Sequence, residues 1–270
     1  VILAPDSRDL SLRLNNEDLT QVDYVFNWLG STNILLPIIN LIEDKLNVDE
    51  DNTHEGVQSL LLVEDSTKMA SIYIRHLYKI ILEQFQEYMI EGLNEHQKMM
   101  QMRGRPKVLL ATNYEDAFDL FNKHKSQLLG IITDVDIKHK GDDTCGPIED
   151  FLRLVKKEDI PILIQSADPG NEKYAREYGD GFLSKNSRDI VPELKSFMKA
   201  HFSFGDFIFT DPETGVEIAR VSDLQSFQRR IFEIPDDSLR YHFSRNHLSK
   251  WLYARAMFSL AEFLKNISPD

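Results

Sequence analysis

Between residues 57 and 203, short apolar runs alternate with segments of helical spacing, and this alternation constrains the fold more than any other feature. In chain order the apolar runs are SLLLV, KVLLAT, LLGIITDV, IPILIQS and GFLSK. Strands that alternate with helices predict a parallel sheet, because parallel strands need crossover connections. Runs without polar alternation are typical of strands covered on both faces. We therefore expect an α/β domain with a doubly wound, parallel, five-stranded sheet over residues 57–203.

Two further segments flank this domain. Residues 1–48 show the pattern strand, helix, strand, helix, with helices expected at DSRDLSLRLNNEDLTQ and STNILLPIINLIEDKLN. The acidic, polar residues 49–56 are expected to form a linker. Residues 204–270 begin with DFIFTDPETGVEIARV, in which DPETG predicts the turn of a β-hairpin. Helical patterns follow, so we expect a small module of one hairpin and several helices.

Composition excludes several classes of protein. The net charge of -13 argues against a nucleic-acid surface, because phosphate recognition needs clustered Lys and Arg. Cys145 is the only cysteine, so no internal disulfide can form, and we interpret this thiol as inert. No apolar run reaches the roughly 18 residues of a membrane span, and the N-terminus lacks the pattern of a signal peptide. We expect a cytoplasmic protein, and the missing initial Met suggests a piece of a longer polypeptide.

Charged and polar residues stand where the expected strands end. In a doubly wound sheet, ligands bind at the carboxyl ends of the strands. The residues at these ends, in chain order, are Glu64 and Asp65, Asp134 with Asp136, Ser166, and Lys185. Carboxylates that converge on one rim repel each other, and a hard cation with oxygen ligands removes this repulsion. The sequence therefore predicts a Mg2+ site formed by Glu64, Asp65 and Asp134.

The same residues suggest phosphoryl chemistry. Asp134 is a candidate nucleophile that forms an aspartyl phosphate. Lys185 would neutralise the phosphoryl oxygens, and Ser166 would donate a hydrogen bond to one of them. The alternatives are a helix N-terminal position for the acidic pair, a loop position for Asp134 and a capping role for Ser166.

Four of these runs, LLLVEDS, GIITDV, PILIQSA and GFLSK, resemble the signatures of response-regulator receiver domains. The resemblance covers about residues 57–202 and implies a flavodoxin-like receiver fold. It implies Glu64 and Asp65 as the acidic pair, Asp134 as the phospho-acceptor and the backbone carbonyl of Asp136 as a further Mg2+ ligand. It also implies Ser166 as the switch hydroxyl, Lys185 as the family lysine and Phe182 as the aromatic switch residue, although plain core packing is the alternative for Phe182.

The chain departs from the receiver pattern in three places. Asn186 follows the lysine, where the family usually has Pro. The helix after the acidic pair, expected to run to about residue 102, is about twice the usual length. The loop after Asp134 is long and charged.

The flanking segments carry resemblances of their own. VILAPDS and VDYVFNWLG resemble the second half of another receiver, in which Trp28 stands where the lysine belongs, so that no phosphorylation chemistry is assigned there. DDSLRYHFSRNHLSKWLYARAMFSLAEFL resembles a stretch of large bacterial proteins related to phosphoenolpyruvate synthase and pyruvate phosphate dikinase. In those proteins receiver-like domains precede the phosphotransfer region, which implies a catalytic domain downstream in the same polypeptide as a partner.

Three functions compete. The first is a signalling domain, phosphorylated by a histidine kinase or a small phosphodonor, that regulates the attached phosphotransfer enzyme. The second is a pseudo-receiver scaffold that docks partners or forms a homodimer through the long helix after Met69. The third is a phosphatase of the haloacid-dehalogenase type with Asp136 as general acid/base. That family places its acidic pair after the lysine, so we disfavour the third and expect this chain itself not to be an enzyme.

Outside the strand ends, His242 and His247 lie five positions apart, so they do not share one face of a single helix. We expect packing or surface roles for them rather than metal binding. Arg245, Asn246 and Arg255 are expected either to brace helix packing or to bind an anion.

Overall fold

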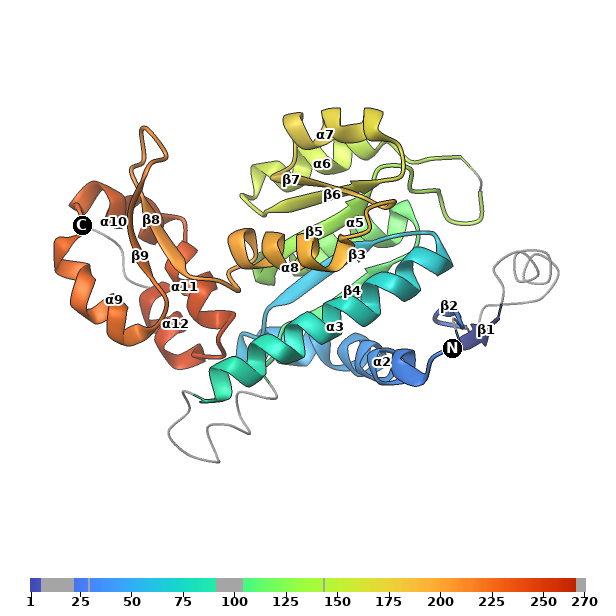
Figure 1. The fold of residues 1–270 in the computed structure, drawn as a ribbon, viewed down its shortest axis with the longest axis horizontal. Coiled ribbons are helices and arrows are strands. Elements are labelled where there is room, and N and C mark those ends of the chain that lie inside the picture. Colours follow the sequence, from blue (N-terminus) through green and yellow to red (C-terminus); the bar gives the residue numbers. More distant parts are fainter. Residues whose placement is uncertain (6–21, 29, 91–103, 143, 266–270) are drawn as a thin grey trace.

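The computed structural model describes residues 1–5, 22–28, 30–90, 104–142 and 144–265 (Figure 1). Its central feature is a five-stranded sheet in the order β4-β3-β5-β6-β7, in which all neighbouring strands are parallel. The strands are β3 (Ser59–Val63), β4 (Lys107–Ala111), β5 (Leu128–Asp134), β6 (Ile162–Ser166) and β7 (Gly181–Ser184). The predicted parallel five-stranded sheet is confirmed, and its strand order is compatible with a flavodoxin-like fold.

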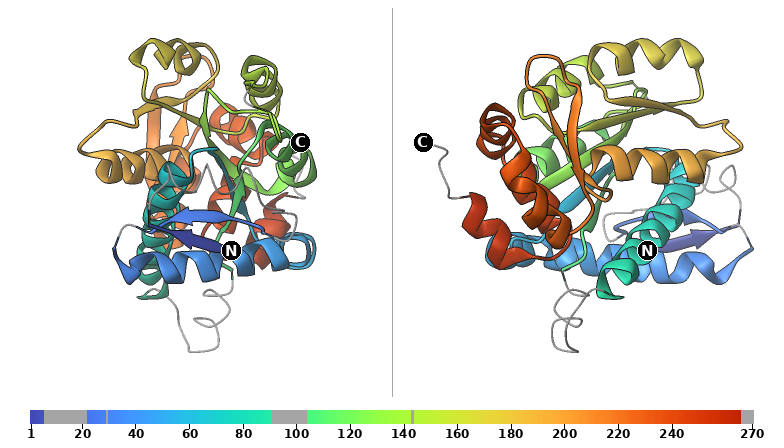
Figure 2. Two further views of the ribbon diagram at one scale, coloured as in Figure 1. Left: turned by 90° about the vertical axis from the view of Figure 1, so that its right-hand side faces the viewer. Right: turned by 60° about the vertical axis from the view of Figure 1, so that its left-hand side comes forward.

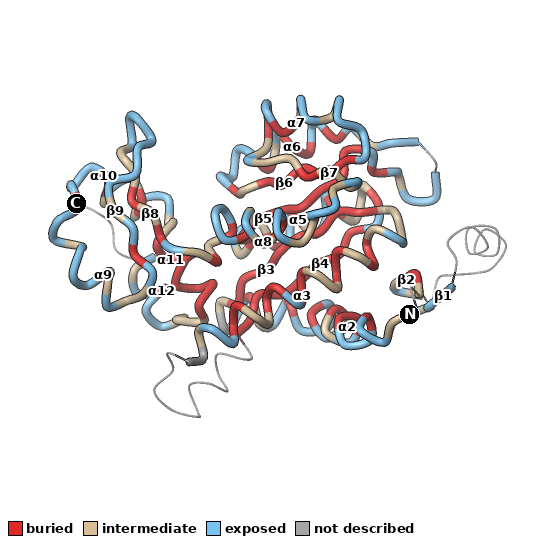
Figure 3. Tube along the Cα trace, in the orientation of Figure 1, coloured by how far each residue is buried: buried red, intermediate tan, exposed pale blue. Residues whose placement is uncertain are grey.

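Helices cover both faces of this sheet (Figures 1 and 2). One face carries α3 (Thr67–Ile90) and α8 (Ile190–His201), and the other carries α5 (Tyr114–His124), α6 (Ile148–Lys157) and α7 (Glu172–Glu177). Side chains alternate along each strand, so Leu60 and Leu62 pack with α3 while Leu61 and Val63 pack with α5 and α6. The strands are consequently the most buried part of the molecule, as Figure 3 shows.

The N-terminal segment packs on α3. It contains the parallel pair β1 (Ile2–Ala4) and β2 (Val25–Asn27), a 3-10 turn η1 (Thr32–Ile34) and the helix α2 (Leu35–Glu50). Phe26, Ile34 and Leu41 belong to the same core as α3 and the central sheet. The helix expected at DSRDLSLRLNNEDLTQ lies outside the described residues.

The polar residues expected as a linker are helical. α2 continues to Glu50, and one π-helical turn, η2 (Asp51–Glu55), follows it. The polar side chains here have partners, because Asn52 is buried and lies 3.0 Å from His124 Nδ1 through its Nδ2 atom. Ser59 Oγ also donates to Asn52 Oδ1 at 3.3 Å. The polar residues 49–56 therefore include side chains that pair inside the structure, and they do not form an extended linker.

The C-terminal module has its own core around Phe209 and Trp251. As expected, it begins with an antiparallel hairpin, and helices follow. Its elements are β8 (Phe207–Thr210), β9 (Glu217–Val221), α9 (Leu224–Arg230), η5 (Ile231–Glu233), α10 (Asp236–Ser244), α11 (His247–Tyr253) and α12 (Phe258–Lys265). The remaining short turns of the chain are η3 (Lys125–Gln127) and η4 (Pro169–Asn171).

The long helix α3 is described as far as Ile90, and its expected continuation lies outside the described residues. In the described part, its buried residues contact the sheet, α2 and β2. A homodimer through this helix stays a prediction. Across the described part of the chain, no helix is both long and apolar enough to cross a membrane.

Candidate functional site

Three carboxylates meet at the carboxyl ends of β3 and β5. Oxygen atoms of Glu64, Asp65 and Asp134 all lie within 4.8 Å of one another. The strands place them there, because β3 and β5 are parallel neighbours in which Val63 pairs with Thr133. The structure thus brings together the three acids that the sequence singled out.

Lys185 bridges two of these acids from the end of β7. Its Nζ atom lies 2.6 Å from Glu64 Oε2 and also forms an ion pair with Asp134 Oδ2. Burial alone would lower the pKa of Lys185, but the charges of Glu64 and Asp134 outweigh it and raise that pKa. The lysine is therefore held as a cation between the acids.

Burial also disfavours the charged forms of Glu64 and Asp65 and so raises their pKa values. Burial raises the pKa of Glu64 to about 7, although Lys185 opposes the shift. Burial and the charge of Asp134 also raise the pKa of Asp65. Lys185, together with Lys138, whose charge acts on Asp65, does not compensate three carboxylates, so the site has a deficit of positive charge that a cation would fill.

Backbone amides fix the carboxylates. Ser66 N donates to Glu64 Oε1 at 2.9 Å, and Val135 N donates to Asp134 Oδ1 at 2.7 Å. Asp136 N lies 3.4 Å from the same Asp134 oxygen, while its own side chain is exposed. These bonds orient Glu64 and Asp134 before any ligand binds.

The two predicted switch residues lie nearby. Ser166 is buried at the end of β6, where its Oγ accepts hydrogen bonds from Asp168 N at 3.1 Å and Asn171 Nδ2 at 3.0 Å. Phe182 is half-buried on β7 and packs with the core on the α6 and α7 side. Their roles in switching stay predictions.

The charged loop after Asp134 borders a cavity beside the acids. Asp65, Asn113 and Lys138 are among the residues that line this cavity of about 570 Å3. The loop is fastened to the start of α5, because Glu115 Oε2 accepts from Lys140 N at 2.8 Å and Glu115 Oε1 lies 2.5 Å from a ring nitrogen of His139. Because Asp65 lines this cavity, a small molecule can reach the acids from this side.

Sequence reasoning missed Gln165, which stands beside Asp134 in the sheet register. It is fully buried, and its Nε2 donates to Glu64 Oε2 at 3.1 Å. The available signal was an amide inside the otherwise apolar run PILIQS.

Asp44 of α2, a buried carboxylate outside this cluster, also escaped the sequence analysis. Its Oδ2 atom accepts from Tyr78 OH at 2.7 Å, Arg105 Nη1 at 2.9 Å and Val108 N at 2.9 Å. Arg105 Nη2 also lies 2.9 Å from Oδ1. Val108 belongs to the edge strand β4, so Asp44 ties α2 and α3 to the edge of the sheet and satisfies an edge amide.

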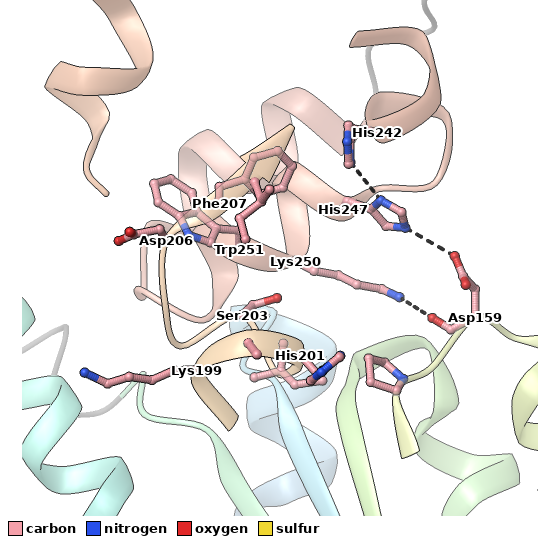
Figure 4. A pocket seen from close by; sticks show the side chains of 14 residues that line it. Asp159, Lys199, His201, Ser203, Asp206, Phe207, His242, His247, Lys250 and Trp251 are labelled. Atoms are coloured by element: carbon pink, nitrogen blue, oxygen red, sulfur yellow. Dashed lines mark hydrogen bonds and ion pairs between the residues drawn. The ribbon is translucent and has the colours of Figure 1, made fainter. Parts of the chain in front are cut away.

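The C-terminal module meets the central domain at the other end of the sheet, around a cavity of about 240 Å3 (Figure 4). His242 and His247 lie on different helices, α10 and α11, and their Nδ1 atoms are 3.0 Å apart. Thr210 N donates to His242 Nε2 at 3.0 Å, so a neutral His242 carries its proton on Nδ1. His242 then donates to His247, whose Nε2 donates to Asp159 Oδ2 at 3.2 Å. This direction of bonding gives both histidines packing roles, as expected.

Two arginines at this interface also brace the packing. Arg255 is buried and donates to Ser203 O at 2.9 Å and Gly205 O at 2.6 Å, with its guanidinium 3.8 Å from the ring centre of Trp251. Arg245 Nη1 lies 3.4 Å from Asp159 Oδ2. Of the two roles left open by the sequence, the structure supports bracing.

His242 predicts how this interface depends on pH. Burial, aided by His247, lowers its pKa to about 4 from an ordinary 6.5. The stability that it contributes is fully present above pH 6.5 and is lost as the pH falls through 4. At about 1.4 kcal/mol per pKa unit, wild type should lose roughly 3 kcal/mol relative to His242→Gln across that window. Urea denaturation at a series of pH values measures this difference.

The control is His201→Gln, at an exposed histidine on the same cavity. Wild type and His242→Gln whose free energies of unfolding change equally with pH would contradict the prediction.

A scan against protein-family models and a search of curated proteins find no match to this chain. The function is therefore inferred from the strand-end residues themselves.

Proposed function

We propose that residues 57–203 form a receiver-like signalling domain that accepts a phosphoryl group on Asp134 in the presence of Mg2+. The observation that carries this proposal is the convergence of three carboxylates and Lys185 at the carboxyl edge of a parallel sheet. Ligands of doubly wound sheets bind at this edge. The parallel sheet, with its strand order compatible with a flavodoxin-like fold, supports the same proposal.

The donor set fits Mg2+. Glu64, Asp65 and Asp134 offer only oxygen atoms, which this cation prefers, and the backbone carbonyl of Asp136 would add another. Among the buried polar atoms without a hydrogen-bond partner in the described residues, Gln165 Oε1 and Tyr73 OH belong to side chains close to Glu64. Orphaned atoms of this kind indicate an absent polar ligand or water. When bound, Mg2+ would neutralise the acids and polarise the phosphoryl oxygens of a donor.

The protein's own groups would carry the transfer. An Asp134 carboxylate oxygen attacks the phosphorus atom of the donor, and the bond from phosphorus to the leaving oxygen breaks, so that the leaving group takes the electron pair. Lys185 already bridges Asp134 and Glu64. It would move to pair with the phosphoryl oxygens, which bring negative charge to Asp134. Ser166 has a hydroxyl hydrogen with which to bind one of those oxygens once it reorients.

The likeness to proteins related to phosphoenolpyruvate synthase suggests what such a domain regulates. We infer that it acts on a phosphotransfer enzyme attached in the same bacterial, cytoplasmic polypeptide, with a histidine kinase or small phosphodonor as the phosphate source. Ser166 and Phe182 would be biased between two arrangements, and the C-terminal module would transmit the change. Residues 1–48 would be the second half of a degenerate receiver.

A scaffold without phosphorylation is the second candidate. It is favoured by Trp28, which stands where the family lysine belongs in the N-terminal segment and packs against the core as an apolar side chain. Labelling with acetyl phosphate, read by intact-mass spectrometry, separates the two candidates. A Mg2+-dependent adduct that requires Asp134 supports the receiver, and its absence under all conditions supports the scaffold.

A further inference from the structure

Gln165 has an unusual position for an amide side chain. It lies on a central strand with 0% of its surface exposed, beside the predicted phospho-acceptor Asp134. Its Nε2 atom donates to Glu64 Oε2 at 3.1 Å, whereas its Oε1 atom has no partner among the described residues. Burying an unpaired amide oxygen costs roughly 1–3 kcal/mol, so the position needs a reason.

The orientation of this amide follows from the neighbouring charge. A carboxylate oxygen only accepts hydrogen bonds, so the NH2 group of Gln165 must face Glu64. The amide oxygen, on the same side chain, is then left as a bare acceptor close to the Glu64 carboxylate. A water molecule in the coordination shell of a cation would donate the missing hydrogen bond. This orphaned oxygen points to a ligand independently of the acidic cluster.

Glu64 needs a hydrogen-bond donor besides Lys185. Its Oε2 atom accepts from both Lys185 and Gln165. Lys185 is shared with Asp134, and it is expected to move toward a phosphoryl group there. Gln165 is then the donor that still holds Oε2, because its backbone is fixed in the sheet between β5 and β7.

We infer that Gln165 is a positioning residue for the divalent cation, which fixes the Glu64 carboxylate through its NH2 group and offers its amide oxygen to a cation-bound water. This inference rests on the proposed function. Partners that orient metal ligands typically contribute about 10- to 100-fold to metal affinity.

The test is calorimetric titration of the full chain with MgCl2. Gln165→Met keeps the length of the side chain but removes donor and acceptor, and it should bind Mg2+ about 10- to 100-fold more weakly than wild type. The matched control is Leu163→Met, two residues earlier on the same buried face of β6. If Gln165→Met fails to fold, Gln165→Asn, which cannot reach Glu64, should weaken binding in the same direction.

A second readout separates positioning from general packing. With acetyl phosphate, Gln165→Met should need more Mg2+ for half-maximal labelling but reach a near wild-type rate at saturating Mg2+. Equal Mg2+ affinity in wild type and Gln165→Met, or an equal loss in Leu163→Met, would overturn the inference and leave the proposed function standing. Failure of wild type to bind Mg2+ would overturn both.

Discussion

Asp44→Ala is expected to lower the free energy of unfolding by about 3–5 kcal/mol, the usual cost of removing one partner from a buried ion pair. Asp44 is 0% exposed and accepts from Tyr78 of α3, from Val108 of β4 and from Arg105, which lies just before β4. Its removal leaves the buried Arg105 guanidinium without its carboxylate and the Val108 amide without an acceptor. Chemical denaturation, followed by far-UV circular dichroism, measures this loss.

The matched control lies on the same helix. Asp49 is exposed and pairs with Lys123 at 2.7 Å, so Asp49→Ala should cost less than about 1 kcal/mol. A loss below about 1 kcal/mol for Asp44→Ala would show that α2 is not tied to the sheet edge in the way described.

Lys185→Met is expected to change both stability and reactivity. Without a divalent cation, it leaves the buried Glu64 and Asp134 unpaired, which should cost roughly 3 kcal/mol or more. Mg2+ should stabilise the variant more than wild type, because the cation then supplies all the compensating charge. The rate of labelling by acetyl phosphate should fall roughly a hundredfold or more, since a charged donor to the phosphoryl oxygens is gone.

Lys195→Met provides the comparison for this variant. Lys195 pairs with Glu83 at 2.9 Å on the surface, so its loss should cost under about 1 kcal/mol and leave labelling unchanged. A Lys185→Met protein that labels at the wild-type rate, or that gains nothing from Mg2+, would contradict the assigned role of Lys185.

The sequence was sufficient to predict the central sheet and the acids at its edge. Each strand appears as a continuous apolar run, because strands covered on both faces have no solvent side to mark with polar residues. Each run except the last is followed by a helix that returns the chain to the start of the next parallel strand, so the residues just beyond the runs lie at one edge of the sheet. Glu64, Asp65, Asp134 and Lys185 were therefore predictable from their place in the pattern, and the structure brings them together.

The missed contacts depend on long-range packing. Asp44 and Arg105 are 61 positions apart, and nothing local marks them as partners. Asn52 looked like part of a polar linker, although it pairs with His124 and Ser59 inside the structure. In each case a buried partner distant in the sequence decides the role of a polar residue, and local pattern does not record that partner.

The most direct test of the central claim is intact-mass spectrometry after incubation with acetyl phosphate, with and without Mg2+, beside Asp134→Asn. The receiver proposal predicts one phosphoryl adduct on wild type, dependent on Mg2+, stable enough to be recorded and absent from Asp134→Asn. Asp136→Asn, at the exposed acid two residues later, should still be labelled. Wild type that shows no adduct with acetyl phosphate and no Mg2+ binding by titration would contradict the proposal, as would an adduct that persists in Asp134→Asn.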